Sequence, residues 1–231
     1  MGKTGGWSIQ VNETSSAIDV EIRLKLAICD STKEKKINLY QLGNAVEKQL
    51  KRSYQITYYK DTYNYSTIRS GLDYFGSRIA AQPVKKIVQV NLKVVFRIIS
   101  TKNQIANDEH LLDLVENTGR FKLIYGRADD LGGSVVSLNA HYVNNIIKGL
   151  DNNTVPHEFG HTLGLLHVDK EATKSKDARQ YWPNQKRWSK DSTNIMFDGR
   201  SRYMHGKTSI SVIGSQIDIA IENYKKDKLN K

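Results

Sequence analysis

The segment of residues 157–167 constrains the fold of this chain more than any other part of its sequence. It reads His-Glu-Phe-Gly-His-Thr-Leu-Gly-Leu-Leu-His. His157 and His161 are four residues apart, so a helix places both imidazoles on one face, about 6 Å apart along the axis. Gly164 can take the left-handed conformation that ends a helix and turns the chain sharply. The segment therefore predicts a helix followed by a turn that brings His167 back towards the same face.

Three histidines in this arrangement are typical of a catalytic metal site. Two imidazoles at helical spacing can reach one metal ion at about 2.0–2.1 Å, and the returning His167 adds a third ligand. Three protein ligands leave a fourth position for water, which distinguishes catalytic from structural zinc sites. Glu158 lies about 100° round the helix from the first ligand, where it can act on that water as general base and then acid. We therefore expect one catalytic Zn²⁺ bound by His157, His161 and His167.

Composition narrows the class of protein. The chain has 231 residues and a single cysteine, Cys29, which excludes a disulfide framework and zinc sites built from several cysteines. No apolar run approaches the ~18 residues of a membrane-spanning helix. A hydrophobic fraction of 39% and a charged fraction of 26% are typical of a globular protein with its own core. No secretory leader is recognised in this chain. We expect a secreted or exported protein, with a cytoplasmic location as the alternative.

The net charge of +11 permits a second interpretation. Basic residues and aromatic residues alternate over residues 170–190, a pattern that can bind nucleic acid. We favour a solvated basic loop there, because the chain has no recognised nucleic-acid-binding motif. The alternative to an enzyme is a non-catalytic basic module that binds nucleic acid or an acidic partner.

Hydrophobic periodicity predicts an α+β fold. Residues 18–28 alternate between apolar and charged side chains, as in a half-buried strand, whereas the apolar residues of 38–52 recur at helical spacing. The expected order is a leader over 1–16, a strand over 18–28, a helix over 38–52, a hairpin or long loop over 54–76, a strand over 86–99, a helix over 108–117, strands over 121–125 and 134–138, a helix over 153–164, irregular chain over 168–193 and a helix over 209–226. No linker separates independent domains.

The histidine segment resembles the extended HExxHxxGxxH motif of the metzincin zinc metallopeptidases. A second likeness is the sequence Asn194-Ile195-Met196-Phe197, which resembles the methionine turn of that clan. The resemblance implies that His157, His161 and His167 bind zinc, that Glu158 is the general base, and that Met196 forms the floor of the site. It also implies a twisted mixed sheet with a backing helix and an active-site helix, followed by a small C-terminal lobe ending in a helix.

This resemblance extends to domain organisation but not to a subfamily. We expect a catalytic domain over 17–231, with an upper lobe over about 17–166 and a lower lobe over about 167–231. Val168 follows the third histidine, where familiar subfamilies carry other residues. Asp198 occupies the place where some members have a tyrosine. The subfamily is therefore unassigned.

The expected substrate is a protein or peptide. Residues 132–138 are expected to form either an edge strand that pairs with extended substrate or an internal strand. The segment after Met196, with its charged residues and Tyr203, is expected to shape a substrate pocket. The basic, cysteine-poor chain also looks like a secreted or contact-delivered bacterial toxin domain, for which an immunity or inhibitor protein would be a partner. An ordinary secreted peptidase is the other context.

Overall fold

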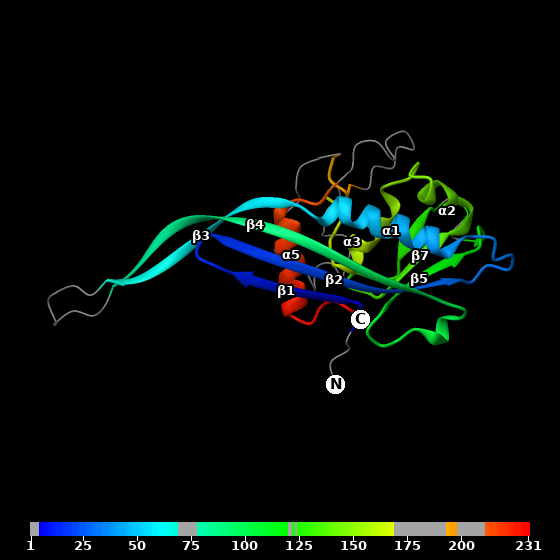
Figure 1. The fold of residues 1–231 in the computed structure, drawn as a ribbon, viewed down its shortest axis with the longest axis horizontal. Coiled ribbons are helices and arrows are strands. Elements are labelled where there is room, and N and C mark those ends of the chain that lie inside the picture. The colour runs from blue at the N-terminus through cyan, green and yellow to red at the C-terminus, as the bar shows by residue number, and fades with distance from the viewer. Residues whose placement is uncertain (1–4, 69–77, 120–121, 123, 169–192, 198–210) are drawn as a thin grey trace.

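The computed structural model describes residues 5–68, 78–119, 122, 124–168, 193–197 and 211–231. These residues form an α+β fold around a mixed sheet (Figure 1), as the periodicity predicted. The strands are β1 (Trp7–Glu13), β2 (Ala17–Asp30), β3 (Thr57–Ile68), β4 (Arg78–Ile99), β5 (His110–Val115), β6 (Gly126–Ala128) and β7 (Val135–Asn139). The helices are α1 (Leu39–Tyr54), the short 3₁₀ helix η1 (Lys102–Gln104), α2 (Ala140–Ile147), α3 (Thr154–Thr162) and α5 (Gly214–Lys225).

Strand β2 forms the centre of the sheet. The strand order is β3-β4-β2-β5-β7-β6, and β1 pairs with β2 in addition. Val20, Ile22 and Leu24 on β2 are fully buried, while Arg23 and Lys25 between and after them are exposed. This alternation confirms the predicted strand, because one face of β2 packs on the core and the other faces solvent.

Helix α1 confirms the prediction over residues 38–52. Asn38 caps its first turn, since the Asn38 side chain accepts a hydrogen bond from the Gln41 N–H at 3.1 Å. The helix lies against β4, where a Cβ on Gly43 would come within 2.3 Å of the Phe96 ring. Glycine at position 43 therefore permits the close approach of helix and sheet. The last helix, predicted over 209–226, is observed as α5.

The N-terminal segment corrects the predicted leader. Trp7–Glu13 form β1, which pairs antiparallel with β2 from Trp7↔Leu24 to Glu13↔Ile18. Trp7 and Ile9 are buried, and this period of two is the signal for a strand. The glycine, serine and threonine residues on either side of this segment obscured that signal in the sequence.

The predicted helix over 108–117 is wrong. His110–Val115 form β5, which pairs in parallel with β2 on one side and β7 on the other. Its first five residues are all buried, including the polar His110 and Asp113, so the strand shows no alternation of buried and exposed positions that would distinguish it from a helix. The strand expected over 134–138 is observed as β7, whereas β6 begins just after the strand expected over 121–125. Helix α2 was not predicted.

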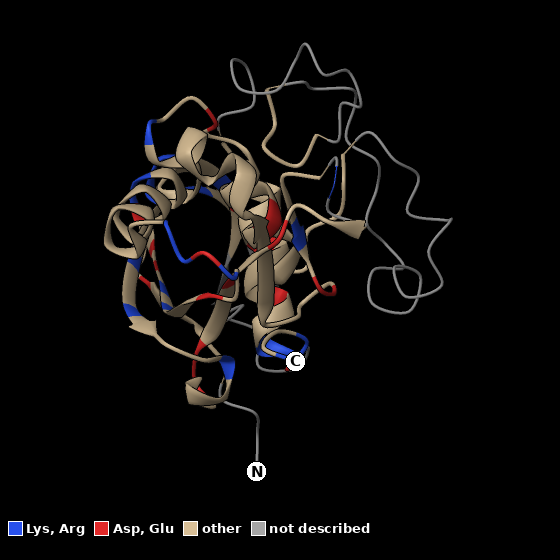
Figure 2. Cartoon of the chain, turned by 90° about the vertical axis from the view of Figure 1, so that its right-hand side faces the viewer, with Lys and Arg blue, Asp and Glu red and all other residues tan. Residues whose placement is uncertain are grey.

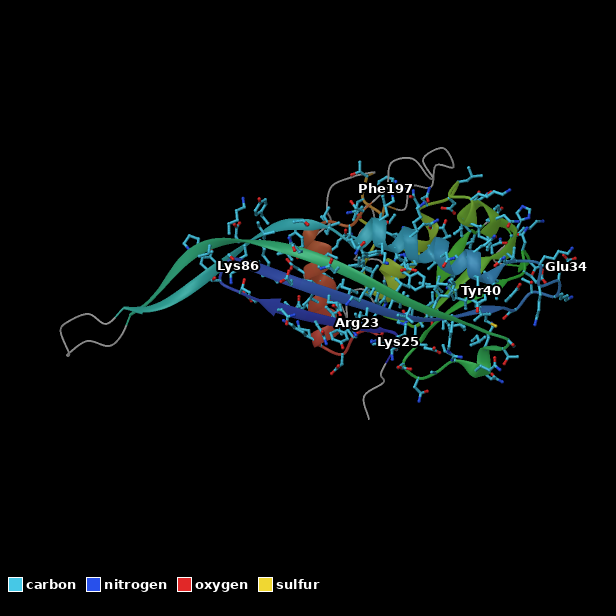
Figure 3. All side chains as sticks on the ribbon, in the orientation of Figure 1. Arg23, Lys25, Glu34, Tyr40, Lys86 and Phe197 are labelled. Carbon is cyan, nitrogen blue, oxygen red and sulfur yellow. The ribbon has the colours of Figure 1, made fainter. Side chains whose placement is uncertain are left out.

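Strands β3 and β4 form the hairpin that was one of two options for residues 54–76. β4 pairs with β2 only from Ile87 onwards, but it pairs with β3 back to Arg78. The hairpin therefore projects from the body of the sheet as a two-stranded ribbon (Figure 1). At its base, the Lys86 Nζ contacts Glu13 Oε1 at 2.7 Å and the Thr14 carbonyl at 2.6 Å (Figure 3).

Candidate metal centre

Helix α3 begins and ends as its sequence requires. Asp151 accepts hydrogen bonds from the N–H groups of Asn153 and Thr154 at 3.0 and 3.1 Å, which satisfies donors at the start of the helix. Gly164 has φ +76° and donates its N–H to the His161 carbonyl at 2.8 Å. The predicted left-handed glycine after the helix is confirmed. Its turn returns the chain towards α3.

The three motif histidines converge. The His167 Nε2 lies 3.0 Å from the His157 Nε2 and 3.1 Å from the His161 Nε2. Tetrahedral ligands at about 2.0–2.1 Å from a zinc ion would be about 3.3 Å apart, within a few tenths of these distances. All three side chains are partly buried, and together they form a group that can hold a metal ion. The structure thus brings together every predicted ligand.

Contacts behind the rings orient two of these histidines. The His157 Nδ1 lies 2.9 Å from the Ile195 carbonyl oxygen, and the His161 Nδ1 lies 2.8 Å from the Leu165 carbonyl oxygen. Because a carbonyl oxygen only accepts hydrogen bonds, each Nδ1 is assigned the proton and acts as the donor. The lone pairs of the two rings are then on Nε2, where the rings converge. This donor set fits Zn²⁺, whose histidine ligands are commonly oriented by such hydrogen bonds.

Glu158 lies beside the histidines and is held by strand β6. Its Oε2 accepts a hydrogen bond from the Ala128 N–H at 2.7 Å. Burial raises the pKa of the Glu158 carboxyl, while the neighbouring His157 and the Ala128 N–H act in the opposite direction. A carboxylate fixed at one oxygen keeps the other, Oε1, for proton transfer.

Met196 packs against α3 at Gly160. A Cβ on Gly160 would lie 2.3 Å from the Met196 Sδ and 2.9 Å from the Tyr54 hydroxyl oxygen. Met196 is fully buried. Glycine at position 160 is thus required for the methionine turn and α3 to lie this close.

The turn that carries Met196 is tied to the rest of the fold. Within it, the Phe197 N–H donates to the Asn194 carbonyl at 3.0 Å. The side-chain amides of Asn194 and Gln216 on α5 exchange two hydrogen bonds, at 2.9 and 3.1 Å. The Val168 N–H donates to the Met196 carbonyl at 3.0 Å. The segment after the third histidine and the last helix therefore both fix the turn that carries Met196.

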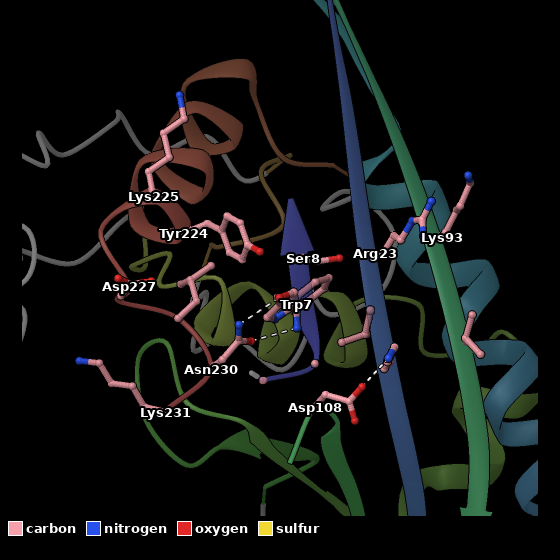
Figure 4. A pocket seen from close by; sticks show the side chains of 16 residues that line it. Trp7, Ser8, Arg23, Lys93, Asp108, Tyr224, Lys225, Asp227, Asn230 and Lys231 are labelled. Carbon is pink, nitrogen blue, oxygen red and sulfur yellow. Dashed lines mark hydrogen bonds and ion pairs between the residues drawn. The ribbon is translucent and has the colours of Figure 1, made fainter. Parts of the chain in front are cut away.

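The far side of α3 is supported by residues that the motif does not include. The Trp7 Nε1–H donates to the Thr162 Oγ1 at 2.9 Å, and the Trp7 ring packs edge-on against Phe159 and His110. Asn230 exchanges two hydrogen bonds with the Trp7 main chain, at 2.9 and 3.0 Å (Figure 4). Sequence reasoning missed this cluster, because no local pattern joins residues so far apart.

The edge of the sheet beside the centre is β6, not residues 132–138. β7 lies between β5 and β6, so it is the internal strand of the two alternatives. A Cβ on Gly126 would lie 2.7 Å from the Thr154 side chain and 3.1 Å from the Glu158 Cγ. Strand β6 therefore runs directly over the start of α3.

One cavity bearing basic side chains lies away from the histidines. It measures about 1150 Å³ and is lined at β1, β2, β4 and the C-terminal segment (Figure 4). Of its basic residues, Arg23 and Lys93 both pair with Glu21, and Lys25 pairs with Asp108. In the view of Figure 2, basic and acidic residues are interspersed over the described chain. Three basic side chains of this cavity are thus paired with carboxylates.

Several predicted features fall outside the described residues. They are the basic loop over residues 170–190, together with Asp198 and Tyr203 after the methionine turn. No helix in the described part of the chain is long and apolar enough to cross a membrane.

Comparisons with known proteins do not assign this chain to a family. No protein-family model matches the chain, and no curated protein matches it. Among solved structures, the chain is similar to the crystal structure of archaemetzincin from Methanopyrus kandleri, with 13% sequence identity and a TM-score of 0.42. That match covers 88% of this chain and 96% of the other. A similarity this weak leaves the function to be judged from the chain's own residues.

Proposed function

We propose that this chain is a zinc-dependent endopeptidase of the metzincin clan. The observation that carries the proposal is the convergence of three histidine Nε2 atoms within about one coordination sphere, with Glu158 beside them. His157, His161 and His167 would hold the ion, and Met196 would form its floor. Bound zinc supplies a Lewis acid that lowers the pKa of water and polarises a peptide carbonyl.

The chain's own residues would then handle the protons. Glu158 Oε1 takes a proton from the attacking water and passes it to the amine that leaves when the peptide bond breaks. The Ala128 N–H holds the other oxygen, Oε2, so the carboxylate keeps its orientation through both transfers. The carbonyls of Ile195 and Leu165 keep the two helix histidines in the tautomer that points Nε2 inward.

The proposal extends to the organisation of the chain and to its substrate. The two lobes would divide at about residue 166, with the site between them and the methionine turn in the second. Substrates would be proteins or peptides in extended form. The basic, cysteine-poor chain would also suit an exported toxin domain, and a protein inhibitor would be the partner in that setting.

The test compares new protein N-termini in a cell lysate treated with the zinc-loaded chain and with its Glu158→Ala variant. We expect new termini with the wild type, and a loss of nearly all of them with Glu158→Ala at unchanged zinc content. The matched control is Glu222→Ala, which removes an exposed carboxylate on α5 and should leave the cleavage pattern unchanged.

Either of two results would contradict the proposal. One is equal cleavage by the wild type and Glu158→Ala, which would exclude Glu158 as the base. The other is a wild-type chain with about one zinc ion that releases no new termini, which would indicate a metal-binding protein without peptidase activity.

A further inference from the structure

Two tyrosines stack on the surface just before the edge strand β6. The rings of Tyr125 and Tyr142 have centroids 3.8 Å apart and planes inclined by 15°. Tyr125 is 41% exposed, and its neighbour Ile124 is 38% exposed. His141 packs edge-on against the Tyr142 ring at 4.8 Å. Exposed aromatic surface of this kind marks a place where an apolar group can bind.

A buried asparagine holds this pair in place. The Asn139 Nδ2 donates to the Ile124 carbonyl at 3.1 Å, and the Asn139 N–H donates to the Tyr125 carbonyl at 2.9 Å. The Asn139 Oδ1 accepts the His141 N–H at 3.0 Å, which caps the helix that carries Tyr142. One fully buried residue, through its main chain and its side chain, thus fixes the backbone under both rings. The stack is preorganised, so a ligand would lose little entropy in ordering it.

The stack lies next to the strand that contacts the proposed general base. Ala128 bonds Glu158, and Tyr125 comes three residues earlier on the same stretch of chain. At about 3.3 Å per extended residue, three residues span roughly 10 Å. β6 ends the sheet, so an extended peptide can pair with its outer edge. A peptide paired there with its scissile bond at Glu158 would place its third residue from that bond beside the tyrosines.

We propose that Tyr125 and Tyr142 form a specificity subsite for an aromatic or large aliphatic side chain about three residues from the scissile bond. This inference rests on the proposed peptidase function, because only a bound peptide substrate brings such a side chain along β6. The tyrosines contact substrate and not the reacting atoms. They therefore affect binding and choice of sequence more than the chemical step.

The experiment uses the zinc-loaded full chain and a library of peptides from a digested proteome. We expect wild-type cleavage sites to be enriched in aromatic or large aliphatic residues at the third position on one side of the bond. Tyr125→Ala and Tyr142→Ala should each raise KM about ten-fold for such a peptide, with kcat nearly unchanged. A peptide with alanine at that position should be cleaved equally by all three proteins. Tyr125→Phe should retain the preference.

Binding without turnover gives a second readout. In the Glu158→Ala background, the dissociation constant of a fluorescein-labelled form of the preferred peptide should rise by the same factor when Tyr125 is replaced by alanine. Tyr59→Ala is the matched control, since Tyr59 is an exposed tyrosine on the hairpin. If the Tyr125→Ala variant does not fold, the same binding measurement on the Tyr142→Ala variant tests the proposal.

The outcomes separate the two proposals. Cleavage that depends on Glu158 but shows no apolar preference at the third position overturns the subsite and leaves the peptidase intact. A preference that survives in both folded alanine variants also overturns it. Wild-type protein that cleaves nothing overturns the peptidase, and the subsite with it.

Discussion

The two sides of helix α3 differ in almost every physical respect. One side carries His157 and His161, which are partly exposed and converge with His167. The other side carries Phe159 and Thr162, which are fully buried against Trp7 and held through it by Asn230. The first side can bind a ligand because it is open, whereas the second is closed and rigid. A nine-residue helix thus joins the histidine surface to a support made from both ends of the described chain.

The largest expected effect concerns the open side. His161→Ala removes one of three nitrogen ligands, so we expect metal content to fall from about one zinc ion per chain to a small fraction of that. Elemental analysis of the dialysed protein measures this, and peptidase activity should disappear with the metal. His141→Ala, at an exposed histidine on α2, should keep its zinc. Equal metal content in both variants would show that the histidine triad is not the zinc site.

A substitution on the closed side of α3 should lower the stability of the folded chain. Trp7→Ala removes a fully buried ring and its hydrogen bond to Thr162, which we expect to lower the free energy of unfolding by about 3–5 kcal/mol. Urea denaturation measures the change, and Tyr40→Ala, at an exposed tyrosine, is the control. A loss below about 1 kcal/mol would mean that the N-terminal strand contributes little to the support of α3.

A smaller effect concerns His110 in the same buried cluster. Burial lowers the pKa of its imidazole to about 3, whereas an unfolded histidine titrates near 6.5. Between about pH 3 and about pH 6.5, the unfolded chain therefore binds a proton at this histidine that the folded chain does not bind. His110 should lower stability by up to about 1.4 kcal/mol for each unit of pH below about 6.5, and it should have no such effect above it.

Urea unfolding of the wild type and of His110→Leu at pH 7, 6 and 5 tests this prediction. The stability difference between the two proteins should shift in favour of His110→Leu as the pH falls. A difference that stays constant over this range would show that His110 binds a proton as readily in the folded chain as in the unfolded chain.

The same contrast explains how far the sequence could predict the site. The convergence of the three histidines was predicted, because His157, His161, Gly164 and His167 all lie within one short stretch of sequence. The closed side was not predicted, because Trp7 and Thr162 are 155 positions apart and no local signal joins them.

The fold shows the same limit. The half-buried strand β2 and helix α1 were predicted because their polar and apolar residues alternate with a clear period. Strand β5 was mistaken for a helix because it is buried on both faces, and its pairing with β2 and β7 is a property of the sheet and not of its own residues.

The pairing of Trp7 with Asn230 also has a consequence for synthesis. These residues are 223 positions apart, so their hydrogen bonds can form only after Asn230 has left the ribosome. At about 5–20 residues per second, Asn230 is made about 11–45 s after Trp7. Helix α3 therefore receives its complete support only after Asn230 has been made. A nascent chain holds the histidine motif well before it holds the structure that makes the motif rigid.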